Sequence, residues 1–160
     1  MDAETFQAEA MQHQRLLYRV SYSILSDNDD CADAVQEALL RAWQHRGSLH
    51  SMEAFRPWLV RILVNVCHTI LRKRVKQRFV PLEDTSAPVA ETGGMPAALD
   101  DALGLLSSEQ RVVTVLHYLE GYSVREIAEM TATPVGTVKT RMMYARQRLQ
   151  GLLREEMEGE

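Results

Sequence analysis

The sequence of 160 residues contains no apolar run that approaches the roughly 18 residues a membrane-spanning helix needs. Its first four residues, MDAE, are acidic, whereas a secretory signal begins with basic residues. Cys31 and Cys67 stand far apart in apolar periodic stretches, so neither a CxxC metal knuckle nor a dense disulfide framework is available. These absences predict a cytoplasmic protein without membrane insertion, whose two thiols are buried and reduced.

Motifs that carry chemistry are also missing. The five histidines, at positions 13, 45, 50, 68 and 117, show no metal-ligand spacing. No paired carboxylates, phosphate-binding glycine loop or nucleophile elbow occurs, and no stretch alternates between apolar and polar residues as a strand does. We therefore expect an all-α protein that is not an enzyme and needs neither a metal nor a cofactor.

The charge of the chain is unevenly distributed. A net charge of −4 would disfavour nucleic acid as a partner if it were spread evenly. Basic residues instead gather in two stretches without acids, 72–78 and 139–154, while acids crowd into 27–37, 83–101 and 155–160. Two basic surfaces on an acidic body are the pattern expected of a DNA binder that avoids indiscriminate binding.

The first half of the chain has helical periodicity. Three apolar stripes predict three helices, over residues 16–24, 32–43 and 55–70. Asp27 is a predicted N-cap of the second helix, Gly47 follows its end, and Ser51 is a predicted cap of the third. Trp43 and Trp58 fall on the apolar stripes, so we assign both to the core rather than to base stacking.

Between residues 80 and 98 the pattern dissolves into proline, glycine, serine, threonine and acids, a composition that buries too little surface to order itself. We predict a flexible linker here, which divides the chain into small helical domains at 1–79 and 99–160. Two capping boxes follow, Ser107 with Gln110 and Ser123 with Glu126, and Gly121 ends the helix that the first box opens.

A short helix, a tight turn at 131–133 and a last helix that begins at Pro134 predict a helix-turn-helix, whose second helix can lie in the major groove of DNA. The alternative for this segment is a helical hairpin with an ordinary solvated basic face. The polar and basic residues expected on the outer faces of the last helix are Thr137, Lys139, Thr140, Arg141, Tyr144 and Arg148. Such side chains can contact phosphates and base edges.

The stretch 106–153 resembles the fourth conserved region of RNA polymerase sigma factors, in YLEGYS at 118–123, EIAE at 126–129 and PVGTVKTR at 134–141. The first half resembles the second conserved region, in DAVQEALLRAW at 33–43 and FRPWLVRILVN at 55–65. With no further domain, the resemblance is to the compact extracytoplasmic-function (ECF) group. It implies that the N-terminal domain recognises the minus-ten element of a promoter and that the C-terminal helix-turn-helix reads the minus-thirty-five element.

The resemblance also implies roles for particular residues. Asn65 matches a position in a loop that grips a base flipped from the non-template strand, and an amide can both donate to and accept from a base edge. The alternative is an asparagine that caps a helix or a turn. The residues expected to bind the backbone of the melting duplex are Arg61, Arg72, Lys73, Arg74 and Lys76.

Three partners follow from the resemblance: core RNA polymerase, promoter DNA and an anti-sigma protein. The polymerase contacts would be the beta-prime clamp helices and the beta flap. The residues expected to dock on the clamp helices are Asp33, Val35, Gln36, Glu37 and Leu40. The competing interpretation is a helix-turn-helix regulator that acts without polymerase, although the first half contains no receiver domain with its strand pattern.

Two features depart from the family pattern. Ala132 stands where relatives have glycine in the turn, and a left-handed conformation there would cost roughly 1 kcal/mol. Met143 and Tyr144 occupy positions at which relatives often place histidine or arginine, so we expect these two to alter which bases are preferred.

Overall fold

The computed structural model describes the backbone of residues 1–76 and 97–158, with side chains through residue 151. Within these ranges every regular element is helical, which confirms the all-α prediction. The N-terminal unit (residues 1–76) contains α1 (Ala3–Gln12), α2 (Gln14–Leu25), α3 (Asn28–Gln44), the short turns η1 (Arg46–Ser48) and η2 (Met52–Ala54), and α4 (Phe55–Lys76). The C-terminal unit (residues 97–158) contains α5 (Ala97–Gly104), α6 (Ser108–Thr114), η3 (Val115–Leu119), α7 (Val124–Met130) and α8 (Val135–Glu158).

Local signals account for most helix starts. The Asp27 carboxylate accepts a hydrogen bond from the backbone N–H of Asp30 at 2.9 Å, as its predicted N-cap role requires. Ser51 was predicted to cap the third helix, and this prediction is wrong. It precedes η2, its side chain makes no cap hydrogen bond, and α4 begins only at Phe55. Helix α1 was not predicted; it buries only two side chains, Phe6 and Ala10.

The N-terminal core forms where α2, α3 and α4 pack against one another, with Leu17, Leu59 and Leu63 completely buried. Trp43 and Trp58 are partly buried and pack against this core, as expected. The two cysteines are buried and unpaired, which agrees with the prediction of reduced thiols. Burial raises the pKa of the Cys67 thiol to about 12, so this side chain is an inert packing group at neutral pH.

In the C-terminal unit both predicted capping boxes are present, one at each of Ser107 and Ser123. Gly121, between η3 and α7, has a φ of +76°. Ala132, in the turn of the helix-turn-helix, has a φ of +50°, so this alanine is left-handed and carries the backbone cost of roughly 1 kcal/mol. Pro134 lies one residue before α8, where its carbonyl accepts from the N–H of Val138 at 3.1 Å. The last two residues of the predicted linker, 97 and 98, belong to α5; the rest of it lies outside the described residues.

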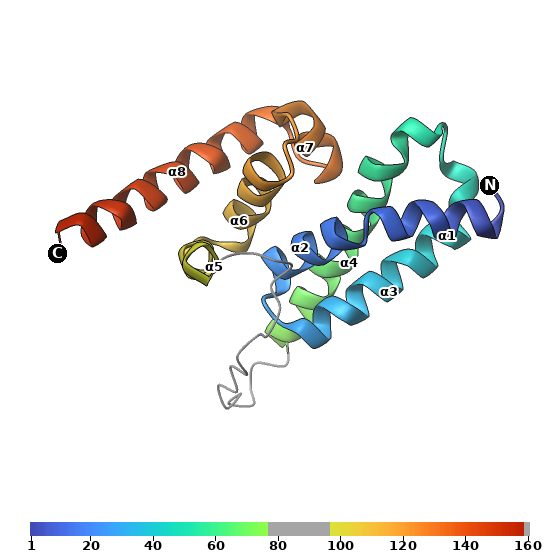
Figure 1. Cartoon of the computed structure of the whole chain (residues 1–160), viewed down its shortest axis with the longest axis horizontal. Coiled ribbons are helices and arrows are strands. Elements are labelled where there is room, and N and C mark those ends of the chain that lie inside the picture. The colour runs from blue at the N-terminus through green and yellow to red at the C-terminus, as the bar shows by residue number, and fades with distance from the viewer. Residues whose placement is uncertain (77–96, 159–160) are drawn as a thin grey trace.

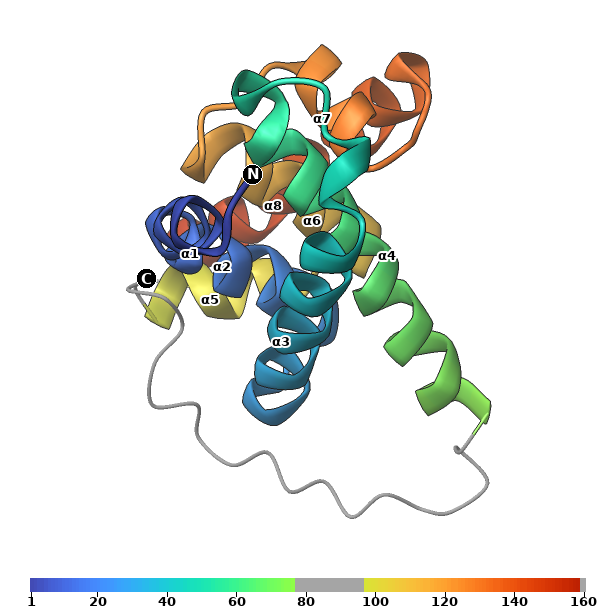
Figure 2. The same cartoon turned by 90° about the vertical axis from the view of Figure 1, so that its right-hand side faces the viewer.

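The two units are packed together. Helix α2 lies against α6 and η3, and α4 lies against α7, as Figures 1 and 2 show. Most buried residues of the two units form one continuous cluster, while a smaller cluster joins α5, η3 and α8 through Leu103, Val115 and Ala145. The C-terminal end of α8 projects away from the other helices of both units (Figure 1). The sequence predicted two helical domains but not this docking.

Candidate nucleic-acid interface

Helix α4 positions the residues expected at the minus-ten element. Asn65 was expected in a loop, but it lies in the middle of α4. The helix continues through it because apolar side chains recur at helical spacing on both sides, with Val60, Val64 and Cys67 buried. The Asn65 carbonyl accepts from the Thr69 hydroxyl at 3.0 Å, and its side chain is exposed, one helical turn beyond exposed Arg61.

A cavity of about 420 Å³ lies beside Asn65. The segment between α3 and α4 forms one wall through Ser48, Leu49 and His50, while Trp58, Arg61, Ile62 and Asn65 of α4 form another. This cavity also has a lining residue from the C-terminal unit, Glu129 of α7. Ser48 and His50 were not predicted as site residues, although the polar break in periodicity between the second and third predicted helices marks the segment that carries them.

The C-terminal end of α4 carries the basic cluster. The side chains of Arg72, Lys73 and Lys76 are exposed. Arg74 differs, because it donates to the carbonyl of Leu25 at 2.8 Å and is paired with the carboxylate of Asp30. We conclude that this arginine holds α4 against the start of α3, whereas its three neighbours present their charge to solvent.

The face of α3 that was expected to dock on polymerase is only partly available. Asp33, Gln36 and Leu40 are exposed, and Leu40 retains 52% of its accessible surface. Glu37 is half-buried and accepts from Arg41 at 2.9 Å. Val35 is 4% exposed and belongs to the core, so its predicted docking contact is wrong. It falls on the buried side of an amphipathic helix, whose opposite side faces solvent.

Helix α8 is oriented by Val138, Met142 and Ala145, which are buried at spacings of four and three residues. Of the residues predicted to contact DNA, Thr137 is half-buried, and Lys139, Thr140, Tyr144 and Arg148 are exposed. The Thr140 hydroxyl donates to the Gly136 carbonyl at 3.0 Å. The Arg141 guanidinium lies 3.6 Å from the carboxylate of Glu109 in α6, so it is directed toward its own unit.

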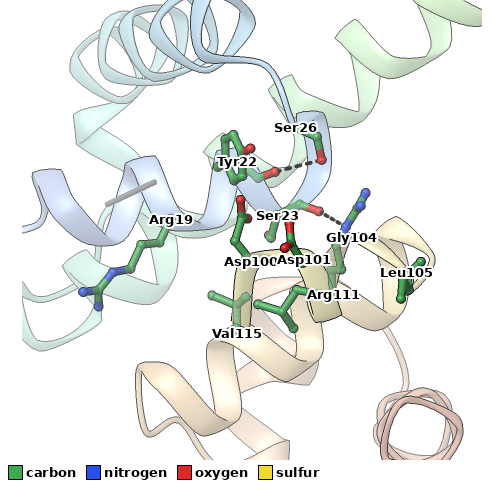
Figure 3. A pocket seen from close by; sticks show the side chains of 11 residues that line it. Arg19, Tyr22, Ser23, Ser26, Asp100, Asp101, Gly104, Leu105, Arg111 and Val115 are labelled. Atoms are coloured by element: carbon green, nitrogen blue, oxygen red, sulfur yellow. Dashed lines mark hydrogen bonds between the residues drawn. The ribbon is translucent and has the colours of Figure 1, made fainter. Parts of the chain in front are cut away.

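Polar contacts join the two units. Arg19 of α2 is paired with Glu120 at 2.8 Å, and the Arg111 Nε donates to the Ser23 carbonyl at 2.7 Å. Beside the second contact lies a cavity of about 440 Å³ between α2, α5 and α6, into which Tyr22 and Asp100 face from opposite sides (Figure 3). Burial raises the pKa of the Asp100 carboxyl.

Each unit places a predicted DNA-contacting residue at the junction, beside residues of the other unit that were not predicted. Glu129 of α7 shares the cavity of Asn65, and Arg141 shares a smaller cavity with Val64 and His68 of α4. Burial lowers the pKa of His68, with a smaller opposing effect from Glu109. The docked arrangement therefore sets two candidate DNA surfaces side by side.

No cluster of three or more potential metal ligands occurs in the described part of the chain. None of its described helices is long and apolar enough to cross a membrane.

Comparison with known proteins matches both halves. Residues 10–77 match the family described as sigma-70 region 2, and residues 97–149 match sigma-70, region 4. The chain is 35% identical over 154 residues to the ECF RNA polymerase sigma factor SigM of Mycobacterium tuberculosis, covering 95% of this chain and 79% of SigM. It is 34% identical over 155 residues to SigL of the same species, covering 90% and 86% of the two chains.

Two solved structures are similar to this chain over nearly its whole length. The sigma factor RpoE in complex with the anti-sigma factor NepR from Bartonella quintana matches with a TM-score of 0.80 and 29% identity, covering 95% of this chain and 98% of RpoE. CnrH in complex with the cytosolic domain of CnrY matches with a TM-score of 0.70 at 24% identity, over 96% and 90% of the two chains, which shows the same fold.

Proposed function

Because the chain belongs to the extracytoplasmic-function group of RNA polymerase sigma factors, which bring core polymerase to promoters, we propose how its two units divide that work. Residues 1–79 dock on the beta-prime clamp helices and open the minus-ten element. Residues 99–160 dock on the beta flap and read the minus-thirty-five element, and residues 80–98 connect the two. The match of both halves, in the order of the family and over most of the chain, carries this proposal.

The minus-ten site is the cavity beside Asn65. Its polar wall at Ser48 and His50, together with exposed Arg61 and Asn65, offers donors and acceptors to an unpaired base. The exposed cations Arg72, Lys73 and Lys76 contact the phosphates of the melting duplex. Extruding one base costs a few kcal/mol, which these contacts offset without chemical fuel.

Polymerase docking uses the exposed part of the α3 face, Asp33, Gln36 and Leu40, with Leu40 as its apolar anchor. A protein interface has an apolar centre and a polar rim, and Leu40 with its polar neighbours can supply both. Polymerase binding also has to move α7 off the Asn65 cavity, because Glu129 would repel the phosphates of an incoming strand. The docked arrangement is thus the form of the protein before it binds polymerase.

We further infer that an anti-sigma protein regulates this chain, since the RpoE structure it resembles is bound to one. The protein acts in the cytoplasm and catalyses no reaction of its own. The competing interpretation, a regulator independent of polymerase, has no support from the relatives, which are sigma factors.

The deciding experiment is in vitro transcription from bacterial genomic fragments with purified core polymerase, with and without this protein, mapping every new start. New starts that share two spaced motifs would support the proposal. No new starts, together with sequence-specific DNA binding and no affinity for core polymerase, would favour the independent regulator.

The role of Asn65 is tested at one of the mapped promoters. Asn65→Ala should impair melting, read by permanganate reactivity of unpaired thymines, while binding to core polymerase persists. Asn28→Ala is the matched control, because Asn28 is an exposed asparagine at the start of α3. Equal loss of melting and of polymerase binding in Asn65→Ala would contradict the role.

A further inference from the structure

The cavity of about 440 Å³ between α2, α5 and α6 lies where the two units meet, and the proposed function makes no use of it. Small-molecule pockets have volumes of about 300–1,000 Å³, so this cavity is large enough for a ligand. Tyr22 and Ser23 line it from the N-terminal unit, and Asp100 and Arg111 line it from the C-terminal unit (Figure 3). A molecule held in this cavity would therefore touch both units at once.

Part of the cavity wall is apolar. Leu103 of α5 and Val115 of η3 are 4% and 1% exposed, and both belong to the lining. Tyr22 adds an aromatic side chain from α2. Such a wall favours a ligand with an aliphatic or aromatic body, because binding then removes apolar surface from water.

Two polar groups in the cavity can bind a ligand. In the part of the chain that the structure describes, neither the hydroxyl of Tyr22 nor the carboxylate of Asp100 has a hydrogen bond or an ion pair. Both side chains are half-buried. A carboxylate and a hydroxyl oxygen both accept hydrogen bonds, so together they can hold a group that carries several donors.

The charges in the cavity favour a cation. Asp101 follows Asp100 in α5 and also lines the cavity. Burial raises the pKa of the Asp100 carboxyl, and the negative charge of Asp101 raises it further. The pKa of Tyr22 is raised by burial and then by the negative charge of Asp100. The effects of these carboxylates indicate a negative potential inside the cavity.

Arg111 also lies on the wall of the cavity, but it does not cancel this negative charge. Its Nε donates to the Ser23 carbonyl at 2.7 Å. Its charge opposes the effect of a carboxylate on the pKa of Asp100 and on the pKa of Tyr22, and in both cases the effect of Arg111 is the smaller one. Arg19, the other arginine in the lining, has a carboxylate partner of its own at 2.8 Å.

We propose that this cavity binds a small organic cation, a primary amine with an aliphatic or aromatic body. Its ammonium group donates to the Asp100 carboxylate and to the Tyr22 hydroxyl, and its body lies against Leu103 and Val115.

The walls of this cation site belong to different units, so the ligand binds only the docked form. The consequence rests on the proposed function, in which polymerase binding moves α7 away from α4. A ligand that binds the docked form alone lowers the affinity of the chain for core polymerase.

The first test is binding of 2-phenylethylamine to the full chain, measured by isothermal titration calorimetry. A molecule of this size should bind with a dissociation constant on the order of 1 mM. The matched neutral compound is 2-phenylethanol, which has nearly the same shape and no charge. It should bind about ten-fold more weakly, because it cannot form the charge-assisted hydrogen bond.

Variants locate the site. Asp100→Asn keeps the shape of the side chain and removes its charge, so it should weaken binding of the amine by about ten-fold. Tyr22→Phe removes a hydroxyl alone and should weaken binding by about three-fold. The matched controls are Asp29→Asn and Tyr18→Phe, at exposed positions of α3 and α2 outside the cavity lining, and both should bind the amine like the natural chain.

A second arm measures the affinity of the chain for core polymerase, with the amine at ten times its dissociation constant. Binding to the docked form alone should weaken this affinity by about ten-fold. The same amine concentration should have only about a two-fold effect on Asp100→Asn, and 2-phenylethanol should have a similarly small effect on the natural chain.

The outcomes separate this inference from the proposed function. Equal binding of the amine and the alcohol, or unchanged binding of the amine to Asp100→Asn, would overturn the cation site while leaving the sigma function intact. Amine binding that depends on Asp100 but does not change the affinity for polymerase would overturn the link to docking. If the chain had no affinity for core polymerase, the sigma function would fail, and the calorimetry would still decide the cation site.

Discussion

Helices α4 and α8 both carry basic stretches, but they expose different chemistry. Arg72, Lys73 and Lys76 cluster at the end of α4, where charge needs no exact placement. On α8 the cations lie beside an uncharged seam centred on Thr140 and Met143. Under the proposed function, α4 would hold the DNA backbone and α8 would distinguish bases, and four changes would break or sharpen this contrast.

The largest effect should come from removing the cluster on α4. Replacing Arg72, Lys73 and Lys76 together by alanine should weaken holoenzyme binding to every promoter alike. It should also reduce the slope of log binding constant against log salt concentration by about 3, because the DNA keeps about one more counterion for each phosphate contact that is lost. Binding titrations across a salt series measure both quantities. Arg15→Ala, at an exposed position in α2, serves as the control. Losses that differ strongly between promoters would assign base reading to α4 as well.

Arg74 should behave unlike its neighbours. Arg74→Ala removes the donor to the Leu25 carbonyl and the partner of Asp30, so it should lower the free energy of unfolding by about 1–3 kcal/mol. Lys73→Ala, one residue away and exposed, should stay within about 0.5 kcal/mol. Chemical denaturation of both variants compares them directly. Equal stability would show that Arg74 is another surface cation.

Local chemistry predicted much of this fold. The capping boxes, the Asp27 cap and the end of a helix at Gly121 depend on residues within a few positions of one another. The docking of the two units does not, since Arg19 and Glu120 are 101 residues apart and neither carries a local signal for the other. Such pairing depends on tertiary packing, which the hydrophobic periodicity of the sequence does not predict.

Two site errors have a different origin. The apolar stripe from Phe55 to Ile70 already predicted a helix through Asn65, and family analogy replaced it with a loop. Val35 was placed on an apolar stripe and also on a docking face, and one side of a helix cannot serve both. In both cases the physical pattern was right: Asn65 lies in a helix and not in a loop, and Val35 lies in the core and not on the exposed face of α3.

Acidification should loosen the contact between α4 and the C-terminal unit. His68 of α4 faces Glu109, Arg72 and Arg141, and its burial holds its pKa below the ordinary value of 6.5. A histidine whose pKa is lower in the folded state stabilises fully above that ordinary value and loses its contribution as the pH falls toward the folded pKa. His13, whose pKa burial also lowers, acts in the same direction.

Urea unfolding at a series of pH values between about 7.5 and 5.5 measures this dependence. With His68→Gln the free energy of unfolding should fall less steeply as the pH is lowered. The part of the fall that is due to His13 should remain, and His13→Gln should remove it. An unchanged slope in His68→Gln would show that His68 protonates as readily in the folded chain as in the unfolded one.

The smallest effect sharpens the contrast at a single atom. Gly136→Ala adds one methyl group to the outer face of α8, where nothing beyond the adjacent backbone of that helix lies within 4 Å, so the folded chain should gain up to about 1 kcal/mol from its restricted backbone. The same methyl group would stand between α8 and the base edges. Binding at the minus-thirty-five element should therefore weaken, although the folded state is more stable. Gly151→Ala, also in α8 and equally uncrowded, tests stabilisation without the DNA effect. Stability and DNA binding that rise together in Gly136→Ala would mean that the DNA meets another face of α8, and the outer face would lose its role.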